Sequence, residues 1–195
     1  MLGVALLLVL LNGFFVIAEF SLVKVRRTRL EELVQQGSGQ AALAMKILNS
    51  FDTYLGATQL GITLSSLALG WIGEPAISAI LEPWLRSSLG MSELMVNTIS
   101  IAIGFAVITF LHIVLGELVP KSMAIQRAER LALFVARPLY VFHKIGYPII
   151  VLFHSAGRVI LKWLGISPAT DAEVAHSEDE LRMIVSASHR GGVLD

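Results

Sequence analysis

Three long apolar stretches constrain the fold of this chain more than any other feature. They cover residues 1–23, roughly 51–72 and about 93–119. About 20 predominantly apolar residues in a helix span the hydrocarbon core of a bilayer, so each stretch predicts a transmembrane helix. The first stretch has no basic start and no small-residue cleavage pattern, which favours a membrane-spanning helix over a signal peptide.

The composition agrees with a membrane protein and argues against several other classes. The 195 residues are 55% hydrophobic and 15% charged, whereas soluble domains carry about 25% charged residues. The formal net charge is zero, so nucleic acid is not an expected partner, because its binding needs a basic face. The absence of cysteine excludes disulfides, thiolate metal sites and a cysteine nucleophile. Because the sequence has no phosphate-binding glycine loop, nucleophile elbow or HExxH motif, an enzyme is not expected.

Lysine and arginine residues predict how the chain crosses the membrane. They gather at 24–29 and at 121–137, whereas the connection 73–92 contains one arginine. Because cytoplasmic flanks collect basic residues, we expect three crossings of the cell (inner) membrane, with the N-terminus outside and the C-terminus in the cytoplasm. Prolines in the connection 73–92 predict short interfacial helices there.

Two further stretches are expected to form amphipathic helices at the membrane surface. Residues 30–48 alternate apolar and polar side chains at helical spacing, with a break at Gly37-Ser38-Gly39. Residues 138–165 are apolar enough for a fourth crossing, but polar side chains recur every four residues within them, in HSAGRVILK. We expect this stretch to lie on the inner membrane surface, and a fourth crossing is the alternative.

The predicted fold is therefore an all-α membrane protein. It has three transmembrane helices per subunit, short interfacial helices and a cytosolic juxtamembrane helix. Its expected divisions are a transmembrane domain at 1–136, a juxtamembrane amphipathic helix at 137–168 and the start of a linker at 169–195. Within the polar tail, Ser177 to Glu180 predict the start of a short amphipathic helix.

Small and polar side chains form a stripe along the second apolar stretch, and Ser65 borders it. The stripe consists of Gly56, Gln59, Thr63, Ser66 and Gly70, which step by three or four residues. Two interpretations remain open. Small residues let helices pack closely in lipid, whereas polar residues in a bilayer core are costly and mark function, here a row of hydroxyl oxygens facing an ion path.

The third apolar stretch ends in LHIVLGELVPKS, which places Glu117 three residues before Pro120. Proline has no amide hydrogen, and in an α-helix the donor of residue 120 would bond the carbonyl of Gly116. This carbonyl is therefore expected to be uncommitted beside a carboxylate. Such an oxygen-rich corner suits the hard cation Mg²⁺. The alternative role for Glu117 is an ion pair with Lys121, one turn later.

Hydroxyl groups of the other stretches are candidates to complete the ligands of the cation. The full set of candidate metal ligands is Glu117, Gly116, Ser66, Ser65, Ser21 and Thr63. In the first stretch, Asn12 is expected to form a helix–helix hydrogen bond, and Glu19 an ion pair with the basic cluster at 24–29. The histidines His112, His143 and His154 lack the spacing of a zinc site.

Three motifs in one order resemble the transmembrane domain of the CorC/cyclin M (CNNM) family of magnesium transporters. They are NGFFVIAEFSLVKVRRTRLEEL, TQLGITLSSLALGWIGEPAI and LGELVPKSMAIQRAERLAL. The final stretch, HSEDELRMIVSASHRGGVLD, is similar to the family's linker into a cytosolic pair of CBS domains.

The resemblance implies a homodimer with three membrane helices per subunit in the lipid bilayer. It also implies export of Mg²⁺, driven by inward Na⁺, and we expect alternating access as the mechanism. The cation site would lie among the three helices, at Ser65, Ser66, Gly116, Glu117 and Ser21. ATP would act only through the CBS pair, which this sequence does not contain.

A different class of function remains open. The chain could be a non-transporting membrane anchor or dimerisation domain for a cytosolic regulatory module, and the polar stripe would then serve packing alone. A channel with passive flux is a further alternative.

Overall fold

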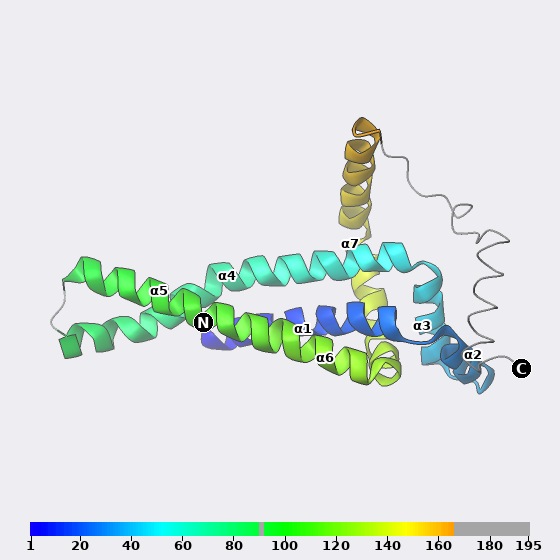
Figure 1. The fold of residues 1–195 in the computed structure, drawn as a ribbon, viewed down its shortest axis with the longest axis horizontal. Helices are drawn as coiled ribbons and strands as arrows, with labels where there is room; N and C mark the ends of the chain where they lie inside the picture. Colours follow the sequence, from blue (N-terminus) through cyan, green and yellow to red (C-terminus); the bar gives the residue numbers. More distant parts are fainter. Residues whose placement is uncertain (90–91, 166–195) are drawn as a thin grey trace, which may run out of the picture. The chain divides into compact units, whose positions relative to one another are not determined.

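The computed structural model describes residues 1–89 and 92–165, and every element in these ranges is helical (Figure 1). Their bounds, in chain order, are α1 Leu2–Lys24, α2 Arg27–Gln35, α3 Gly39–Asn49, α4 Phe51–Leu89, α5 Glu93–Leu111, the π-helix η1 His112–Leu118, α6 Val119–Gln126 and α7 Ala128–Trp163. The predicted all-α fold is confirmed for this part of the chain.

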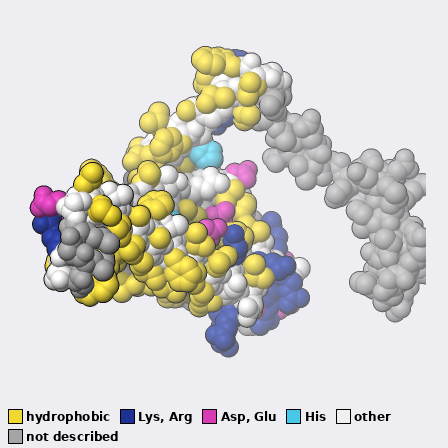
Figure 2. Space-filling model, turned by 60° about the vertical axis from the view of Figure 1, so that its left-hand side comes forward, with side chains coloured by type: hydrophobic (Ala, Val, Ile, Leu, Met, Phe, Trp, Pro, Cys, Tyr) yellow, Lys and Arg dark blue, Asp and Glu magenta, His cyan; other side chains and the backbone are white. Residues whose placement is uncertain are grey.

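The three expected apolar stretches are helices long and apolar enough to cross a membrane. They correspond to Leu2–Lys24, Phe51–Ser87 and Glu93–Gln126, and Ala128–Trp163 also qualifies by length and composition within the described residues. Figure 2 shows hydrophobic side chains over much of one face, with lysine and arginine gathered towards one end. A multi-pass membrane protein is compatible with these helices, while the expected number of three crossings stays a prediction.

Helix α1 lies at the centre of the bundle. It packs against α4, η1 and α6, and α4 packs against α5. Glycines allow these close approaches: a Cβ atom at Gly61 would lie 2.5 Å from the ring of Phe15, and one at Gly73 would lie 2.5 Å from the side chain of Ile108.

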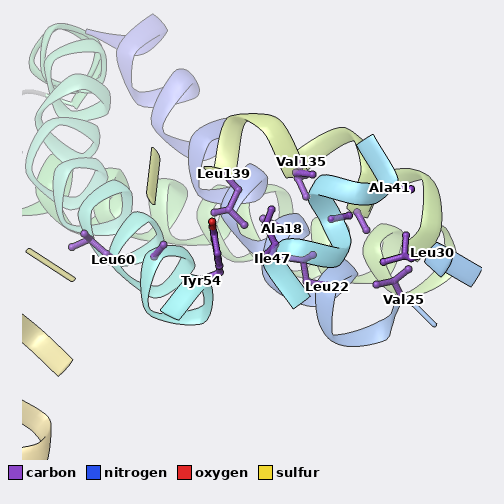
Figure 3. Packing of buried hydrophobic residues seen from close by; sticks show 14 of the residues in the cluster. Ala18, Leu22, Val25, Leu30, Ala41, Ile47, Tyr54, Leu60, Val135 and Leu139 are labelled. Carbon is purple, nitrogen blue, oxygen red and sulfur yellow. The ribbon is translucent and has the colours of Figure 1, made fainter. Parts of the chain in front are cut away.

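The larger hydrophobic core joins the C-terminal half of α1 to the surface helices (Figure 3). Leu22 of α1, Leu30 of α2, Ile47 of α3, Tyr54 of α4 and Leu139 of α7 all belong to it. This packing explains why the short helices α2 and α3 form, because helices of this length are marginal on their own.

The turn between α2 and α3 lies where the sequence predicted a break. Gly37 has a φ of +86°, a left-handed conformation that glycine adopts without steric cost. The next residue, Ser38, caps α3 by accepting a hydrogen bond from the amide of Ala41.

The prediction of short interfacial helices at 73–92 was wrong. Helix α4 continues through Pro75 and Pro83 as far as Leu89. Tertiary contacts outweigh the proline signals here: Ala76 and Leu85 are buried, and Ser78 donates a hydrogen bond of 3.1 Å to the Ser100 carbonyl of α5. Proline is tolerated in membrane helices when neighbouring helices support them.

The third stretch also differs from its predicted end near residue 119. The helix passes through η1, in which the amide of Val119 donates to the carbonyl of Val114, five residues earlier, and runs on as α6 to Gln126. A segment of π-helix inside a longer helix is often found at functional sites.

Helix α7 begins at Ala128, rather than at the expected boundary at 137, and continues through Pro138 and Pro148. Residues up to Val151 belong to one compact unit of the chain and those from Leu152 to a second unit. The position of α7 relative to the membrane stays a prediction. The proposed linker at 169–195 and the short helix predicted at 177–180 lie outside the described residues.

The two basic clusters lie together at one end of the bundle. Arg29 of α2 forms an ion pair of 3.1 Å with Glu129 of α7, which joins the cluster after α1 to the cluster after α6. This agrees with placing both clusters on the same side of the membrane, and the orientation of the termini stays a prediction.

Candidate functional site

The side-chain amide of Asn12 is the centre of a polar network inside the bundle. Asn12 is 2% exposed. Its Nδ2 donates to the carbonyl oxygen of Gly116 at 2.9 Å, and its Oδ1 lies 3.2 Å from the hydroxyl of Ser65 and 3.1 Å from that of Ser66. One side chain thus connects α1, α4 and η1, and the helix–helix hydrogen bond expected of Asn12 is confirmed.

The local sequence of η1 makes the Gly116 carbonyl accessible to this amide. A Cβ atom at this position would lie 2.9 Å from the ring of His112 and 3.2 Å from Nδ2 of Asn12, so a glycine is needed for the approach. Pro120 follows without an amide hydrogen. A carbonyl that loses a main-chain donor needs another partner when it is buried, and Asn12 supplies it.

Each serine hydroxyl has a single hydrogen atom, so it can donate to only one of the oxygen atoms near it. The single hydroxyl hydrogen of Ser65 is best placed for the Gly61 carbonyl, 2.6 Å away within α4. The oxygen atoms of Ser65 and Asn12, 3.2 Å apart, then face each other without a hydrogen between them. Such a pair of oxygen lone pairs is the arrangement that a bound cation stabilises.

Ser66 connects the network to His112, whose Nε2 lies 3.2 Å from the hydroxyl oxygen. When Ser66 donates its hydrogen to Asn12, it accepts from His112, which requires a proton on Nε2. The sequence contained a partial signal for this residue, since His112 and Gly116 share one helix face. The histidines were considered only as zinc ligands, so the contact of His112 with Ser66 was not predicted.

Three of the six candidate ligands therefore lie together. Ser65 is 2% exposed, Ser66 is half-buried and Gly116 is buried. All three contact Asn12. Their oxygen atoms come from α4 and η1, and their role as cation ligands stays a prediction.

The carboxylate of Glu117 does not join this network. Its side chain is 50% exposed, and its Oε1 lies 3.5 Å from Nζ of Lys121, which is its one polar side-chain partner within residues 1–89 and 92–165. The ion pair that the sequence offered as the alternative role of Glu117 is therefore the contact observed. The main chain of Glu117 nevertheless directly follows the Gly116 carbonyl.

The remaining two candidates lie away from the network. Ser21 is buried and donates to the Ala18 carbonyl of its own helix at 3.3 Å. It lies about 13 Å further along the α1 axis than Asn12. Thr63 is exposed, because residues 63 and 65 are about 200° apart around a helix.

The stripe predicted along α4 is not the packing face of the helix within the chain. Gln59, Thr63 and Gly70 are exposed, and Ser66 alone reaches the Asn12 network. The buried residues in this part of the helix include Ala57, Thr58, Gly61, Ser65 and Leu69. Ser65, which the sequence placed at the border of the stripe, thus lies on the buried face and contacts Asn12.

Carboxylate and histidine side chains do not form a metal-binding cluster in the described ranges. No group of three or more His, Asp or Glu residues there could hold a metal ion. The Asn12 network itself offers hydroxyl, amide and carbonyl oxygens, which are the ligand atoms that hard cations prefer.

An apolar cavity of about 290 Å³ lies beside the network. Val9 of α1, Ile108 and Leu111 of α5 and Leu115 of η1 contribute to its lining. Val9 precedes Asn12 by less than one turn, so the cavity extends from the network towards the N-terminal end of α1, alongside the C-terminal end of α5. A hydrated ion would not cross this lining readily, because it offers no polar replacement for water.

Comparisons with known proteins agree with the resemblance seen in the sequence. The family model described as the cyclin M transmembrane N-terminal domain (CNNM) matches residues 3–195. UPF0053 protein YhdT of Bacillus subtilis is 42% identical over 188 residues, which cover 96% of this chain and 41% of that protein. UPF0053 protein YrkA of the same organism is 40% identical over 189 residues, or 97% of this chain and 43% of that protein.

A more distant relative extends the comparison to another genus. The uncharacterized protein Rv1841c of Mycobacterium tuberculosis is 37% identical over 191 residues, which cover 98% of this chain and 54% of that protein. The chain thus spans about half the length, or less, of these curated relatives. The family predicted from three sequence motifs is confirmed, and the chain belongs to the CNNM family, whose cyclin M transmembrane N-terminal domain it matches over nearly its whole length.

Proposed function

We propose that this chain is the ion-translocating membrane domain of a Mg²⁺ exporter that works as a homodimer in the cell membrane. The observation that carries the proposal is the convergence of oxygen atoms from α4 and η1 around the buried amide of Asn12 on α1. Polar groups inside a membrane bundle are costly and mark ion pathways. Membership of the CNNM family supports a transport role for this network.

The proposed ligands are the hydroxyls of Ser65 and Ser66, the carbonyl of Gly116 and the carboxylate of Glu117. In the cation-free arrangement Asn12 contacts the first three. Glu117 supplies negative charge when its carboxylate leaves Lys121 and turns to the ion. Mg²⁺ keeps near-octahedral oxygen coordination at about 2.1 Å and often uses one or two carboxylates, so water completes the shell. Ser21 and Thr63 take no part in this arrangement.

The proposed mechanism is alternating access. The apolar lining next to Val9 and Leu115 offers a hydrated ion no polar groups on the way towards the N-terminal end of α1, so in this proposal release on that side requires α1 to move relative to η1. Na⁺ is also a hard cation and would use the same oxygen atoms. Exchange of Mg²⁺ for Na⁺ then follows from competition for one site.

Regulation by ATP belongs, in this proposal, to a part of the protein beyond this chain. The curated relatives are about twice as long as the matched region, which leaves room for a cytosolic CBS pair. Cation binding and translocation require the membrane helices alone.

Flux measurements in liposomes test the proposal. The purified chain is reconstituted with a Mg²⁺-sensitive dye inside the vesicles, and a Na⁺ gradient is imposed in either direction. We expect saturable Mg²⁺ movement against the direction of Na⁺ flow. Mg²⁺ flux that does not depend on the Na⁺ gradient would contradict the exchange of Mg²⁺ for Na⁺ and would indicate a channel.

One observation favours a second function, that of a membrane anchor or dimerisation domain. The Glu117 carboxylate contacts Lys121 and not the Asn12 network, as it would in a purely structural role. Isothermal titration with Mg²⁺ separates the two functions, because an anchor shows no saturable binding that depends on Glu117.

A further inference from the structure

Lys121 of α6 interacts with the carboxylates of two different elements of the bundle. Its ammonium nitrogen is 3.5 Å from Oε1 of Glu117, and it is also the basic group that acts electrostatically on Glu19 of α1. The same nitrogen lies 4.5 Å from the centroid of the Phe20 ring. One ammonium group therefore has two contacts, one of them with the carboxylate proposed to bind the transported ion, and a longer-range attraction to a second carboxylate.

The contact between Lys121 and Glu117 is weak enough for a cation to replace the ammonium group at the carboxylate. Hydrogen bonds between ammonium and carboxylate groups are commonly about 2.7–2.9 Å long, so a contact of 3.5 Å is a loose one. The two side chains are 35% and 50% exposed, and half-exposed pairs contribute little to stability. A divalent ion, with twice the charge of an ammonium group, competes well for such a carboxylate.

When a cation displaces the Lys121 ammonium group from Glu117, other favourable partners are near it. Glu19 offers a second carboxylate, and the face of Phe20 attracts a cation through its quadrupole. Lys121 can therefore move away from Glu117 without losing all of its favourable contacts.

We propose that Lys121 is an internal competitor for the transported cation, which occupies the Glu117 carboxylate while the site is empty and moves towards Glu19 and Phe20 when a divalent cation binds. This inference rests on the proposed function of the Asn12 network. The ammonium group keeps the empty site electrically balanced inside the membrane, where an isolated carboxylate is costly. It also weakens cation binding, which permits release.

Isothermal titration of the detergent-solubilised chain with MgCl₂ tests the inference. Lys121→Met removes the charge and keeps most of the apolar stem, and Lys121→Arg keeps the charge. We expect the Mg²⁺ dissociation constant of Lys121→Met to fall by about 3- to 10-fold, in line with the modest strength of a half-exposed ion pair. Lys121→Arg should stay within about twofold of the wild type.

The effect of Glu19→Gln on Mg²⁺ binding distinguishes a competing Lys121 from a purely structural one. This change removes the second partner of the ammonium group, so Lys121 should hold Glu117 more firmly and Mg²⁺ should bind more weakly. The two substitutions then act in opposite directions. In a double-mutant cycle, Glu19→Gln should have a smaller effect in the Lys121→Met background, because the competitor is absent.

The outcomes separate this inference from the proposed function. Wild-type binding with equal or weaker binding by Lys121→Met would overturn the inference and leave the cation site in place. Absence of saturable Mg²⁺ binding in the wild type would overturn both. Lys121→Gln serves as a second neutral variant, and gel filtration with circular dichroism confirms that each variant is folded.

Discussion

The side-chain amide nitrogen of Asn12 lies 2.9 Å from the main-chain carbonyl oxygen of Gly116, although 104 residues separate the two in the chain. The contact needs a residue without a side chain at position 116 and benefits from the missing amide hydrogen of Pro120. The other end of the same amide faces the hydroxyls of α4. The polar groups that hold α1, α4 and η1 together are thus the same groups that we propose as part of the cation site.

Replacement of Asn12 by Ala should lower stability and weaken Mg²⁺ binding together. The change leaves the buried Gly116 carbonyl and the Ser66 hydroxyl without their partner on α1. Hydrogen bonds between membrane helices contribute about 1–2 kcal/mol at most, so a fall of this size in the free energy of unfolding is expected. Thermal unfolding in detergent and Mg²⁺ titration measure the two effects.

Asn97→Ala is the matched control for that change. Asn97 lies on α5 and is exposed, so its loss should alter neither the unfolding temperature nor Mg²⁺ binding. Equal effects of the two substitutions would contradict a special role for the Asn12 network.

The sequence singled out three residues that meet in the Asn12 network, but it did not predict their arrangement. It identified Ser65, Ser66 and Gly116 because polar and small groups stand out within apolar stretches. It could not decide which face of α4 is buried, since adjacent residues point about 100° apart and both candidate faces carry small side chains. The contact that resolved this question is between helices, and no local pattern encodes it.

Replacement of Glu117 by Gln should abolish saturable Mg²⁺ binding while the protein stays folded. The substitution keeps the size of the side chain and removes the charge that the neutral oxygens of the network cannot supply. The ion pair lost with it is half-exposed, so the stability should change by less than about 1 kcal/mol. Titration calorimetry and thermal unfolding are the two measurements.

Glu31→Gln provides a control of the same geometry. Glu31 pairs with Arg27 at 3.4 Å, also across one helical turn, but on the surface helix α2. Its loss should leave Mg²⁺ binding unchanged. Retained Mg²⁺-dependent flux in Glu117→Gln would remove this carboxylate from the proposed mechanism.

Gly61→Ala should push α1 and α4 apart. The added Cβ atom would meet three ring atoms of Phe15 at 2.5 Å, and this ring also packs against Phe14 and Phe142. Overpacking of this kind costs about 1–3 kcal/mol, and the shift would also separate Asn12 from Ser65. A lower unfolding temperature with weaker Mg²⁺ binding is expected.

The comparison with Gly70→Ala isolates the steric effect. A Cβ atom at Gly70 meets nothing within 4 Å, and alanine favours helix over glycine. This variant should therefore be as stable as the wild type or slightly more stable. Destabilisation of both variants to the same degree would show that α4 is sensitive to any change in helix propensity and not to its distance from α1.

The ends of the long helices show why some boundaries could not be predicted. The bounds of α1 follow from an apolar run that ends at basic residues, and the structure confirms them within one or two positions. The continuation of α4 through Pro75 and Pro83 depends on packing against α5, which local proline signals do not reveal. The π-helical segment before Pro120 likewise has no signature in the pattern of apolar residues.

Single-cysteine labelling should place the C-terminal end of α7 on the same side of the membrane as the basic clusters. The natural chain has no cysteine, so Arg26→Cys, Ser87→Cys and Lys162→Cys each report one position. We expect Arg26→Cys to react with an impermeant maleimide from the cytoplasmic side and Ser87→Cys from the opposite side. If α7 lies along the inner surface, as its polar face predicts, Lys162→Cys reacts like Arg26→Cys. Reaction of Lys162→Cys from the same side as Ser87→Cys would establish α7 as a fourth crossing, for which its length and hydropathy suffice.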